Sequence, residues 1–326
     1  MTTMASVGHD IHRAKLLLEK GELVAIPTET VYGLAGNALE ANVVAKIFAT
    51  KDRPFFDPLI VHVPSMEYAT QFVNEVPDQA HQLVNRFWPG PLTLLLNKKE
   101  IIPDLVTAGL ERVGIRCPDH SLTRALLEQL SFPLAAPSAN PFGYVSPTTA
   151  QHVNDQLGGK ITYILDGGSC RIGIESTIVG WEDGRPIVYR LGGTSVEQIE
   201  SVIGKIEIKR YSTSQLQAPG QMKSHYAPAK KFLLGDIEIL AKKYSTHRLG
   251  ILSFQDEKVK AQGHVNLVLS PAGDLNEAAQ NLFSMLRQFD NMNVDFVLAE
   301  EVPDEGLGRA INDRLRRAAA SSEATK

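Results

Sequence analysis

The sequence predicts an α/β protein of two domains, with mixed strands and helices in the first and a small doubly wound unit in the second. Three observations support this prediction. The chain has 326 residues, more than one ordinary core needs. Short β-rich runs alternate with helical patterns from residue 22 to about 205, which is typical of α/β or α+β layers. A polar, weakly periodic stretch then precedes a cleaner alternation. We therefore expect domains at 1–206 and 231–326, joined by a linker at 207–230.

Composition narrows the class of protein. The chain is 43% hydrophobic and 21% charged, which indicates a globular protein. Its net charge of -4 argues against a general nucleic-acid coat, although a local basic cavity is compatible with it. Cys117 and Cys170 are too few for a disulfide framework and fit a reduced, cytoplasmic setting. We see no signal-peptide core, and no apolar run approaches the ~20 residues that cross a bilayer.

The first part of the N-terminal domain alternates helices and strands. "IHRAKLLLEKG" (11–21) predicts a short amphipathic helix that ends at Gly21. "ELVAIPT" (22–28) is apolar and short, which favours a buried strand. "EANVVAKIFATK" (40–51) places its apolar residues on one helical face, and Pro54 prevents continuation. "PLIVHV" (58–63) and "PLTLLLNKK" (91–99) are typical of strands.

The rest of this domain continues the alternation. "GIRCP" (114–118) predicts a strand, and "SLTRALLEQL" (121–130) a helix with Ser121 as its N-cap. "FPLAAPSAN" (132–140) is a strand that runs into a polar loop. "SPTTAQHVNDQL" (146–157) predicts a helix with Ser146 at the N-cap and Pro147 at its first position. Two alternating runs around Asp183-Gly184 predict a hairpin.

The second domain has the clearer pattern. Three strands of parallel type and two helices are expected: "RLGILSF" (248–254), "HVNLVLS" (264–270), "NVDFVLAE" (293–300), "DLNEAAQNLFSMLRQFD" (274–290) and "GLGRAINDRLRRAAA" (306–320). These elements make a small doubly wound α/β unit. It lacks a G-x-G-x-x-G segment after a strand, so a dinucleotide role is not indicated.

Chemistry must come from dispersed groups, because no Walker A, H-E-x-x-H or G-x-S-x-G motif occurs. The first cluster, "IPTETVYGL" (26–34), reads as a strand-to-loop turn or, on the alternative, as the wall of a small-ligand site. The second holds Lys51 and Arg53 in the last helical turn, where cations are common. Its alternative is phosphate binding, with Asp57 orienting Arg53. His62 reads as a neutral histidine in an apolar strand.

The third cluster is a pair of arginines in one strand. Arg112 and Arg116 are four residues apart and share a face, so they repel unless an anion or a carboxylate lies between them. We favour a ligand anion there. Together with the other clusters, this pair suits the positioning and charge neutralisation of a polyanionic substrate, as in phosphoryl or nucleotidyl transfer.

The last two clusters offer hydroxyl and amide groups. "AAPSANPFGYVS" (135–146) lets a ligand approach the backbone, or forms a simple surface turn. Its hydrogen-bonding side chains are Ser138, Asn140 and Ser146. "GIESTIV" (173–179) opens a hairpin strand with Ser176, and Arg190 ends the partner strand. Arg190 beside two glycines suits a ring or phosphate lying on the backbone, with a rim salt bridge as the alternative.

In this order, the clusters resemble the YrdC-like family of threonylcarbamoyl-AMP synthases over residues 10 to about 205. The match rests on "PTETVYGL", K-x-R-P and "PSAN", while "PGQMKSHYAP" (219–228) and "GLGRAINDRLRRAA" (306–319) resemble its longer, two-domain branch. The resemblance implies a twisted sheet around a basic cavity. It also implies that L-threonine, bicarbonate and Mg²⁺-bound ATP give threonylcarbamoyl-AMP and pyrophosphate. A separate transferase complex then modifies the tRNA adenosine beside the anticodon.

The resemblance also implies the role of each site residue. The residues expected to contact threonine are Thr30, His62, Arg116, Ala136 and Ser176. Those expected to contact ATP are Arg53, Asp57, Arg112, Ser138, Asn140, Ser146, Arg190 and Tyr226. Lys51 and Arg53 are the catalytic pair, since they would neutralise phosphates. The linker that carries Tyr226 is expected to fold over the cavity as a lid.

Two positions depart from the family pattern. Asp57 stands where the family commonly has asparagine, which leaves a contact with ATP, a contact with Mg²⁺ or a pair with Arg53 open. Arg112 varies in type within the family, so a backbone contact is its alternative. Two other functions compete: a non-catalytic RNA-binding or ribosome-assembly protein, and a hydrogenase-maturation carbamoyl transferase. The acidic net charge opposes the first, and the missing zinc-finger cysteines oppose the second.

Overall fold

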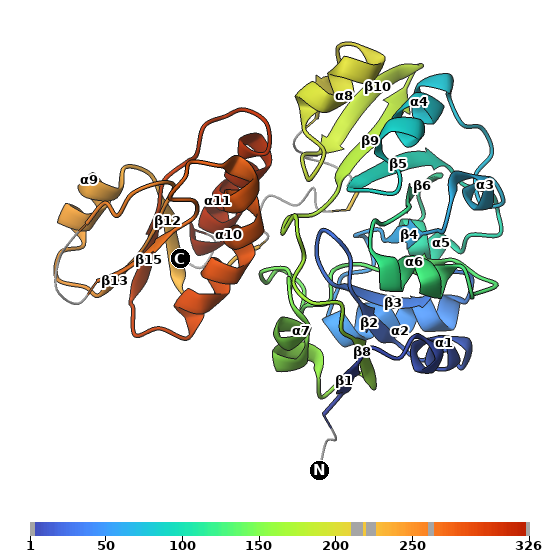
Figure 1. Cartoon of the computed structure of the whole chain (residues 1–326), viewed down its shortest axis with the longest axis horizontal. Helices are drawn as coiled ribbons and strands as arrows, with labels where there is room; N and C mark the ends of the chain where they lie inside the picture. The colour runs from blue at the N-terminus through green and yellow to red at the C-terminus, as the bar shows by residue number, and fades with distance from the viewer. Residues whose placement is uncertain (1–3, 210–217, 220–225, 260–263, 324–326) are drawn as a thin grey trace. The chain divides into compact units, whose positions relative to one another are not determined.

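The computed structural model describes residues 4–209, 218–219, 226–259 and 264–323, with side chains up to residue 320 (Figure 1). The chain divides into two compact units. The first contains residues 1–142, 147–171 and 175–222, and the second contains 143–146, 172–174 and 223–326. The predicted lid at 207–230 lies largely outside the described residues, so it stays a prediction.

A mixed sheet forms the centre of the first unit, with eleven strands among the described residues. Among the described residues, five pairs of neighbouring strands are parallel and five are antiparallel. In spatial order the strands are β1 (Ser6–Gly8), β8 (Tyr163–Leu165), β2 (Val24–Ile26), β3 (Gly33–Asn37), β7 (Leu134–Ala135), β4 (Ile60–His62), β6 (Arg112–Arg116), β5 (Leu92–Asn97), β9 (Thr177–Glu182), β10 (Arg185–Arg190) and β11 (Glu207–Ile208). This mixed α/β architecture confirms the predicted fold class.

Helices of the first unit connect these strands. They are α1 (Ile11–Glu19), α2 (Ala41–Lys51), α3 (Met66–Ala69), α4 (Asp78–Phe87), α5 (Asp104–Thr107), α6 (Ser121–Leu127), α7 (Ala150–Leu157) and α8 (Val196–Ile203). Helix α2 buries the apolar face that its periodicity predicts. It ends at Lys51, because Asp52 turns into the left-handed region at φ 54°. Arg53 therefore lies beyond the helix and not in its last turn.

Both predicted N-caps were wrong. Helix α6 is capped by His120, one residue before Ser121. Helix α7 starts at Ala150, and its N-cap is Thr149, whose side chain accepts from the His152 amide. The chain stays extended before Thr149 because its carbonyls bond elsewhere. The Pro147 and Thr148 carbonyls accept from Tyr32 (2.8 Å) and Cys170 (2.9 Å), so Ser146 does not start the helix.

Turn chemistry was predicted more reliably than small-residue strands. The hairpin β9–β10 is confirmed, with Asp183 and Gly184 at φ 49° and 73°, as a type I′ turn requires. Strand β3, "GLAGN", was not predicted because it lacks β-branched residues. Its small residues permit close packing: a Cβ on Gly36 would lie 2.7 Å from Val43 and 2.9 Å from Leu23.

The second unit holds a parallel sheet, with four strands among the described residues. The order is β12 (Lys231–Leu234), β15 (Phe296–Ala299), β13 (Leu249–Ser253) and β14 (Val265–Val268). Its helices are α9 (Ile237–Lys243), α10 (Leu275–Asp290) and α11 (Gly308–Glu323). The three predicted strands and both predicted helices are present; β12 was not predicted. No helix in the described part of the chain is long and apolar enough to cross a membrane.

Candidate active site

The end of helix α2 is tied to the loop after β7. Lys51 is 1% exposed, and its Nζ donates to the backbone carbonyls of Ser138 and Asn140. Burial lowers the pKa of Lys51 well below its ordinary value; Arg53 lowers it further, and Asp57 opposes the shift. Two sequence clusters that lie almost ninety residues apart therefore meet here through one buried amine.

Arg53 is held by the segment that follows it. Its Nη2 lies 2.9 Å from Oδ2 of Asp57, and both side chains are buried. Its Nε donates to the Asp57 carbonyl (3.0 Å), and Nη2 donates to the Pro58 carbonyl (2.8 Å). The guanidinium carbon lies 5.8 Å from the centroid of the Phe142 ring. The pair with Arg53, which the sequence left open for Asp57, is thus present.

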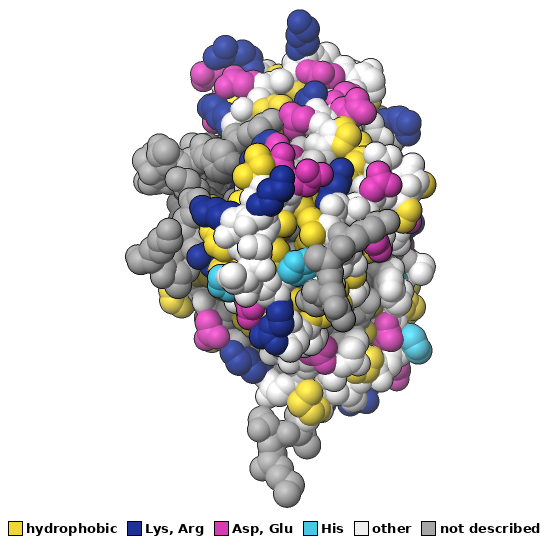
Figure 2. Space-filling model, turned by 90° about the vertical axis from the view of Figure 1, so that its left-hand side faces the viewer, with side chains coloured by type: hydrophobic (Ala, Val, Ile, Leu, Met, Phe, Trp, Pro, Cys, Tyr) yellow, Lys and Arg dark blue, Asp and Glu magenta, His cyan; other side chains and the backbone are white. Residues whose placement is uncertain are grey.

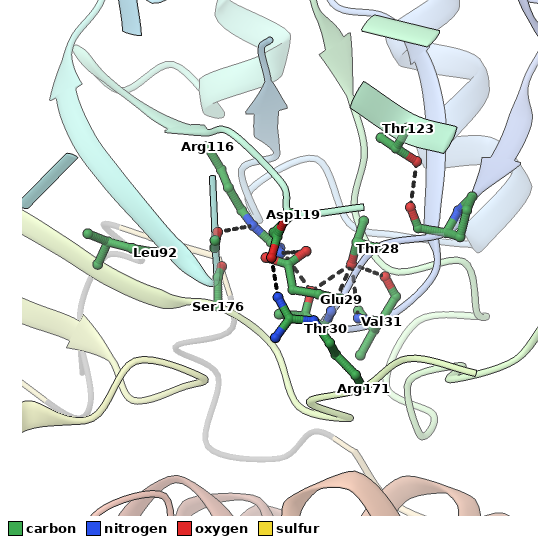
Figure 3. Close-up of polar contacts among 12 residues, drawn as sticks. Thr28, Glu29, Thr30, Val31, Leu92, Arg116, Asp119, Thr123, Arg171 and Ser176 are labelled. Atoms are coloured by element: carbon green, nitrogen blue, oxygen red, sulfur yellow. Dashed lines mark hydrogen bonds and ion pairs between the residues drawn. The ribbon is translucent and has the colours of Figure 1, made fainter. Parts of the chain in front are cut away.

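Arg116 is the centre of a second group (Figure 3). Its Nη2 lies 2.7 Å from Oε2 of Glu29, Nη1 donates to Thr30 Oγ1 (2.9 Å), and Nε donates to the Gly90 carbonyl (3.2 Å). Glu29 and Arg116 are 1% and 4% exposed. The carboxylate beside Arg116 therefore comes from the protein, and the prediction of a ligand anion between Arg112 and Arg116 is not needed to explain the pair.

The turn that presents Thr30 is built by Thr28. Thr28 Oγ1 accepts from the amides of Thr30 (3.1 Å) and Val31 (3.2 Å) and donates to the Val31 carbonyl (2.6 Å). It also lies 2.8 Å from Thr30 Oγ1. The expected strand-to-loop turn is present, but its carboxylate, Glu29, reaches Arg116 and does not bond the local backbone.

Arg112 contacts the hairpin formed by β9 and β10. Its Nη1 donates to the Trp181 carbonyl (3.2 Å) and to the Tyr189 hydroxyl (2.9 Å). Its guanidinium also lies over the Tyr189 ring, 5.0 Å from the centroid. Tyr189 in turn donates to Oε1 of Glu182 (2.6 Å). Arg112 and Arg116 therefore have separate protein partners, although they share one strand.

Ser176 is fixed by two strands. Arg190 donates from Nε to the Ser176 carbonyl (3.0 Å) and from Nη2 to its hydroxyl (3.0 Å). The Thr93 hydroxyl lies 2.8 Å from Ser176 Oγ. Arg190 is 7% exposed and also donates to the Pro219 carbonyl (3.4 Å), so it is not the rim salt bridge that was considered as an alternative.

His62 and Ala136 flank this group. His62 in β4 is paired in register with Arg116 in β6. Burial and, to a lesser extent, the charge of Arg116 lower the pKa of His62 to about 3, so the imidazole is neutral at pH 7 as expected. Ala136 donates its amide to the Ile60 carbonyl (3.0 Å), and its methyl lies 3.2 Å from where a Cβ on Gly33 would stand. A side chain at position 33 would therefore crowd Ala136.

Two predicted ATP residues belong to the second unit. Ser146 is fully buried. Tyr226 is 2% exposed and adopts φ 66°, uncommon for a residue other than glycine. Its ring stacks on Phe283 at 5.7 Å between centroids, and the Arg314 guanidinium lies 5.1 Å from its centroid. Of the "HYAP" segment, the histidine lies outside the described residues.

The structure adds residues that the sequence did not single out. Glu29 pairs with Arg116 and Thr93 bonds Ser176, two residues that are predicted to contact the substrate L-threonine. Thr28 shapes the loop that carries a third such residue, Thr30. The opposite charges of two strand-end clusters were the only signal for Glu29. Among the described residues, no group of three or more His, Cys, Asp or Glu side chains could hold a metal ion. The arrangement offers buried cations and fixed hydroxyls, which suit an amino-acid carboxylate and phosphates.

Comparison with known proteins covers almost the whole chain. A family model described as "Telomere recombination" (Sua5, YciO and YrdC) matches residues 16–192, and one described as "Threonylcarbamoyl-AMP synthase, C-terminal domain" matches 194–320. The chain is 40% identical to a threonylcarbamoyl-AMP synthase of Pyrococcus abyssi, over 98% of both chains. It is 41% identical to one of Bacillus subtilis, over 95% of this chain and 92% of the relative. The crystal structure of P. abyssi Sua5 complexed with L-threonine matches 98% of both chains at 39% identity and a TM-score of 0.90.

Proposed function

This chain belongs to the family of threonylcarbamoyl-AMP synthases, in the two-domain form, and we propose that it makes threonylcarbamoyl-AMP and pyrophosphate from L-threonine, bicarbonate and ATP. The observation that carries this proposal is the full-length match to a relative solved with L-threonine. The buried group around Arg116 supports it, because a guanidinium beside fixed hydroxyls is a suitable site for an amino-acid carboxylate.

Threonine is the substrate that the group around Arg116 suits. Arg116 would bind the carboxylate of threonine. The hydroxyls of Thr30 and Ser176 would form hydrogen bonds with the ammonium or the hydroxyl group of the substrate. The neutral imidazole of His62 adds no positive charge that would repel a substrate amine.

ATP is the substrate that the group around Lys51 and Arg53 suits. Lys51 at the end of α2 and Arg53 just beyond it are buried basic groups, and a phosphate beside Lys51 would favour its protonated form, opposing the lowered pKa. Ser138, Asn140 and Arg190 would bond the remainder of the nucleotide. We propose that Mg²⁺ enters as part of the ATP substrate, because the described residues offer no carboxylate cage and Asp57 is paired with Arg53.

The reaction needs positioning more than covalent chemistry. The threonine nitrogen attacks the carbon of bicarbonate, and one oxygen leaves as water to give a carbamate. A carbamate oxygen then attacks the α-phosphorus of ATP, and the bond to the β-phosphate oxygen breaks with release of pyrophosphate. Lys51 and Arg53 would stabilise the charge that grows on the phosphates. The buried site would also keep water from the carbamate and the mixed anhydride.

The wider setting is part of the proposal. A tRNA threonylcarbamoyl transferase complex would consume the product, and a direct contact with tRNA is open. On the face in Figure 2, lysines and arginines are interspersed with acidic side chains, which does not favour the RNA-binding alternative. Cys117 and Cys170 are buried free thiols, in agreement with a cytoplasmic location.

Pyrophosphate release from Mg-ATP by the purified chain tests the function. Release should require both L-threonine and bicarbonate; release that needs neither would overturn the synthase assignment. Lys51→Ala and Arg53→Ala should each lower the rate by about 100-fold or more, since a lost transition-state contact costs roughly 3 kcal/mol. Lys46→Ala is the control, because Lys46 is an exposed lysine on the same helix. Near-normal rates in both test variants would remove their proposed phosphate role.

A further inference from the structure

The second unit incorporates two short pieces from the middle of the chain. Residues 143–146 and 172–174 cluster with 223–326, although both lie within the predicted catalytic domain. The first piece ends at Ser146, a predicted ATP residue. The second ends two residues before Ser176, a predicted threonine residue. The contacts that hold these pieces can therefore affect the positions of Ser146 and Ser176.

Helix α10 holds the first piece. Arg287 is 7% exposed; its Nε donates to the Ser146 carbonyl (3.3 Å) and its Nη2 to the Val145 carbonyl. The guanidinium also lies over the Tyr144 ring, 5.0 Å from the centroid. One buried side chain thus contacts three consecutive residues, and two of these contacts are to the backbone.

A second residue of the same helix strengthens this hold. Asp290 lies three positions after Arg287 in α10, so both side chains share one face of the helix. Its Oδ2 accepts from the Tyr144 hydroxyl, and its Oδ1 accepts from the Lys230 amide (3.1 Å). Ala227, the residue after Tyr226, donates its amide to the Gly143 carbonyl (3.2 Å). The segment 143–146 is therefore fixed at both ends.

The same helix contacts the second piece through backbone. Gly173 has φ +78°, and a Cβ there would lie 2.5 Å from the Gln280 Cα and 2.7 Å from the Ala279 carbonyl oxygen. Gln280 and Arg287 are seven residues apart, about two turns, and face the same side. One face of α10 therefore contacts both pieces.

We propose that Arg287 is a positioning residue for nucleotide binding, which acts by fixing the backbone of Val145 and Ser146. This inference rests on the proposed function, because it needs Ser146 to contact ATP. It assigns α10 an indirect role in nucleotide binding, through the backbone that carries Ser146. A lysine at 287 would keep the charge but lose the planar fork that reaches two carbonyls.

Steady-state kinetics of Arg287→Lys tests the proposal. The KM for ATP should rise about tenfold with kcat within roughly twofold of wild type, because a ground-state contact is lost. Ser146→Ala should raise the same KM. If Arg287 acts through Ser146, adding Arg287→Lys to Ser146→Ala should change the KM little further. Additive losses would overturn the proposal. Arg316→Lys is the control, since Arg316 lies on α11 and pairs with Glu301.

Amide hydrogen exchange separates this inference from the proposed function. Exchange at Tyr144, Val145 and Ser146 should be faster in Arg287→Lys than in wild type, whether or not the chain releases pyrophosphate. Unchanged exchange would refute the positioning role, while inactive wild-type protein would refute the function alone. Tyr144→Phe is the second variant, for the case that Arg287→Lys unfolds the unit. It keeps the ring beneath Arg287 but removes the hydroxyl that bonds Asp290, so exchange at these amides should increase by a smaller amount.

Discussion

Glu29 and Arg116 form a buried ion pair, with 2.7 Å between Oε2 and Nη2 and less than 5% of either residue exposed. The two residues come from different sequence clusters, 87 positions apart. A guanidinium in such a place needs an anion, since an unpaired buried charge is costly. Glu29 supplies that anion from within the protein, so Arg116 is held in place without a bound ligand.

Glu29→Gln should destabilise the protein, and L-threonine should partly restore it. The amide keeps the shape but leaves Arg116 without a counter-charge, which costs about 3 kcal/mol. A threonine carboxylate would then replace the missing charge, so L-threonine should raise the midpoint of urea unfolding more in the variant than in wild type. Glu19→Gln, in an exposed pair with Lys15, is the control. A variant as stable as wild type would show that the pair contributes nothing.

Asp57→Asn should lower the KM for ATP. The carboxylate of Asp57 lies beside Arg53, where it partly cancels the charge offered to phosphates. Arg53 would keep its bonds to the carbonyls of residues 57 and 58, which hold its orientation. Loss of the buried pair should lower the free energy of unfolding by about 3 kcal/mol, as in Glu29→Gln. Removing one like charge near a triphosphate is worth about 1 kcal/mol, or roughly fivefold in KM.

Pyrophosphate release at varied ATP concentration measures this effect. Asp52→Asn is the matched control, because Asp52 is an exposed neighbour paired with Lys160. A raised KM in Asp57→Asn alone would instead show that Arg53 depends on the carboxylate for its position.

Arg190→Lys should weaken the binding of both substrates, whereas Thr93→Val should affect threonine alone. Arg190 fixes the carbonyl and the hydroxyl of Ser176 and is itself a predicted ATP residue. The Thr93 hydroxyl bonds the Ser176 hydroxyl and is not itself a predicted ATP contact. We expect a KM for L-threonine about tenfold higher in each variant, and a raised KM for ATP in Arg190→Lys only. Equal effects on ATP in both variants would contradict this division.

Local chemistry predicted much of the fold, and tertiary contacts decided the rest. Asp183-Gly184 specified its hairpin because both residues tolerate positive φ. The face of α2 followed from periodicity. Ser146 was wrongly predicted to cap α7, since distant Tyr32 and Cys170 use the carbonyls of Pro147 and Thr148.

The candidate site shows the same limit. Residue types predicted cations and hydroxyls at strand ends, and the family resemblance gave them roles. Neither could predict the partner of Arg116, because Glu29 reaches it only through the strand order of the folded sheet. Thr93 was missed because its strand reads as an apolar core strand, with nothing to mark one inward hydroxyl. The contacts of Arg287 with 145–146 likewise depend on how α10 packs.

His62 should make the protein sensitive to acid. Its pKa is about 3 when folded and about 6.5 when unfolded, so between these values only the unfolded chain binds the proton. The contribution of His62 to the free energy of unfolding is therefore fully present above about pH 6.5. It is lost as the pH falls, by roughly 2–3 kcal/mol at pH 4.5. His62→Gln should lose this component, so its free energy of unfolding should change less between pH 7 and 4.5. Urea titrations at both pH values measure the difference, with His81→Gln, at an exposed position, as the control. Parallel pH profiles for wild type and His62→Gln would mean that His62 is protonated in the folded protein as readily as in the unfolded chain.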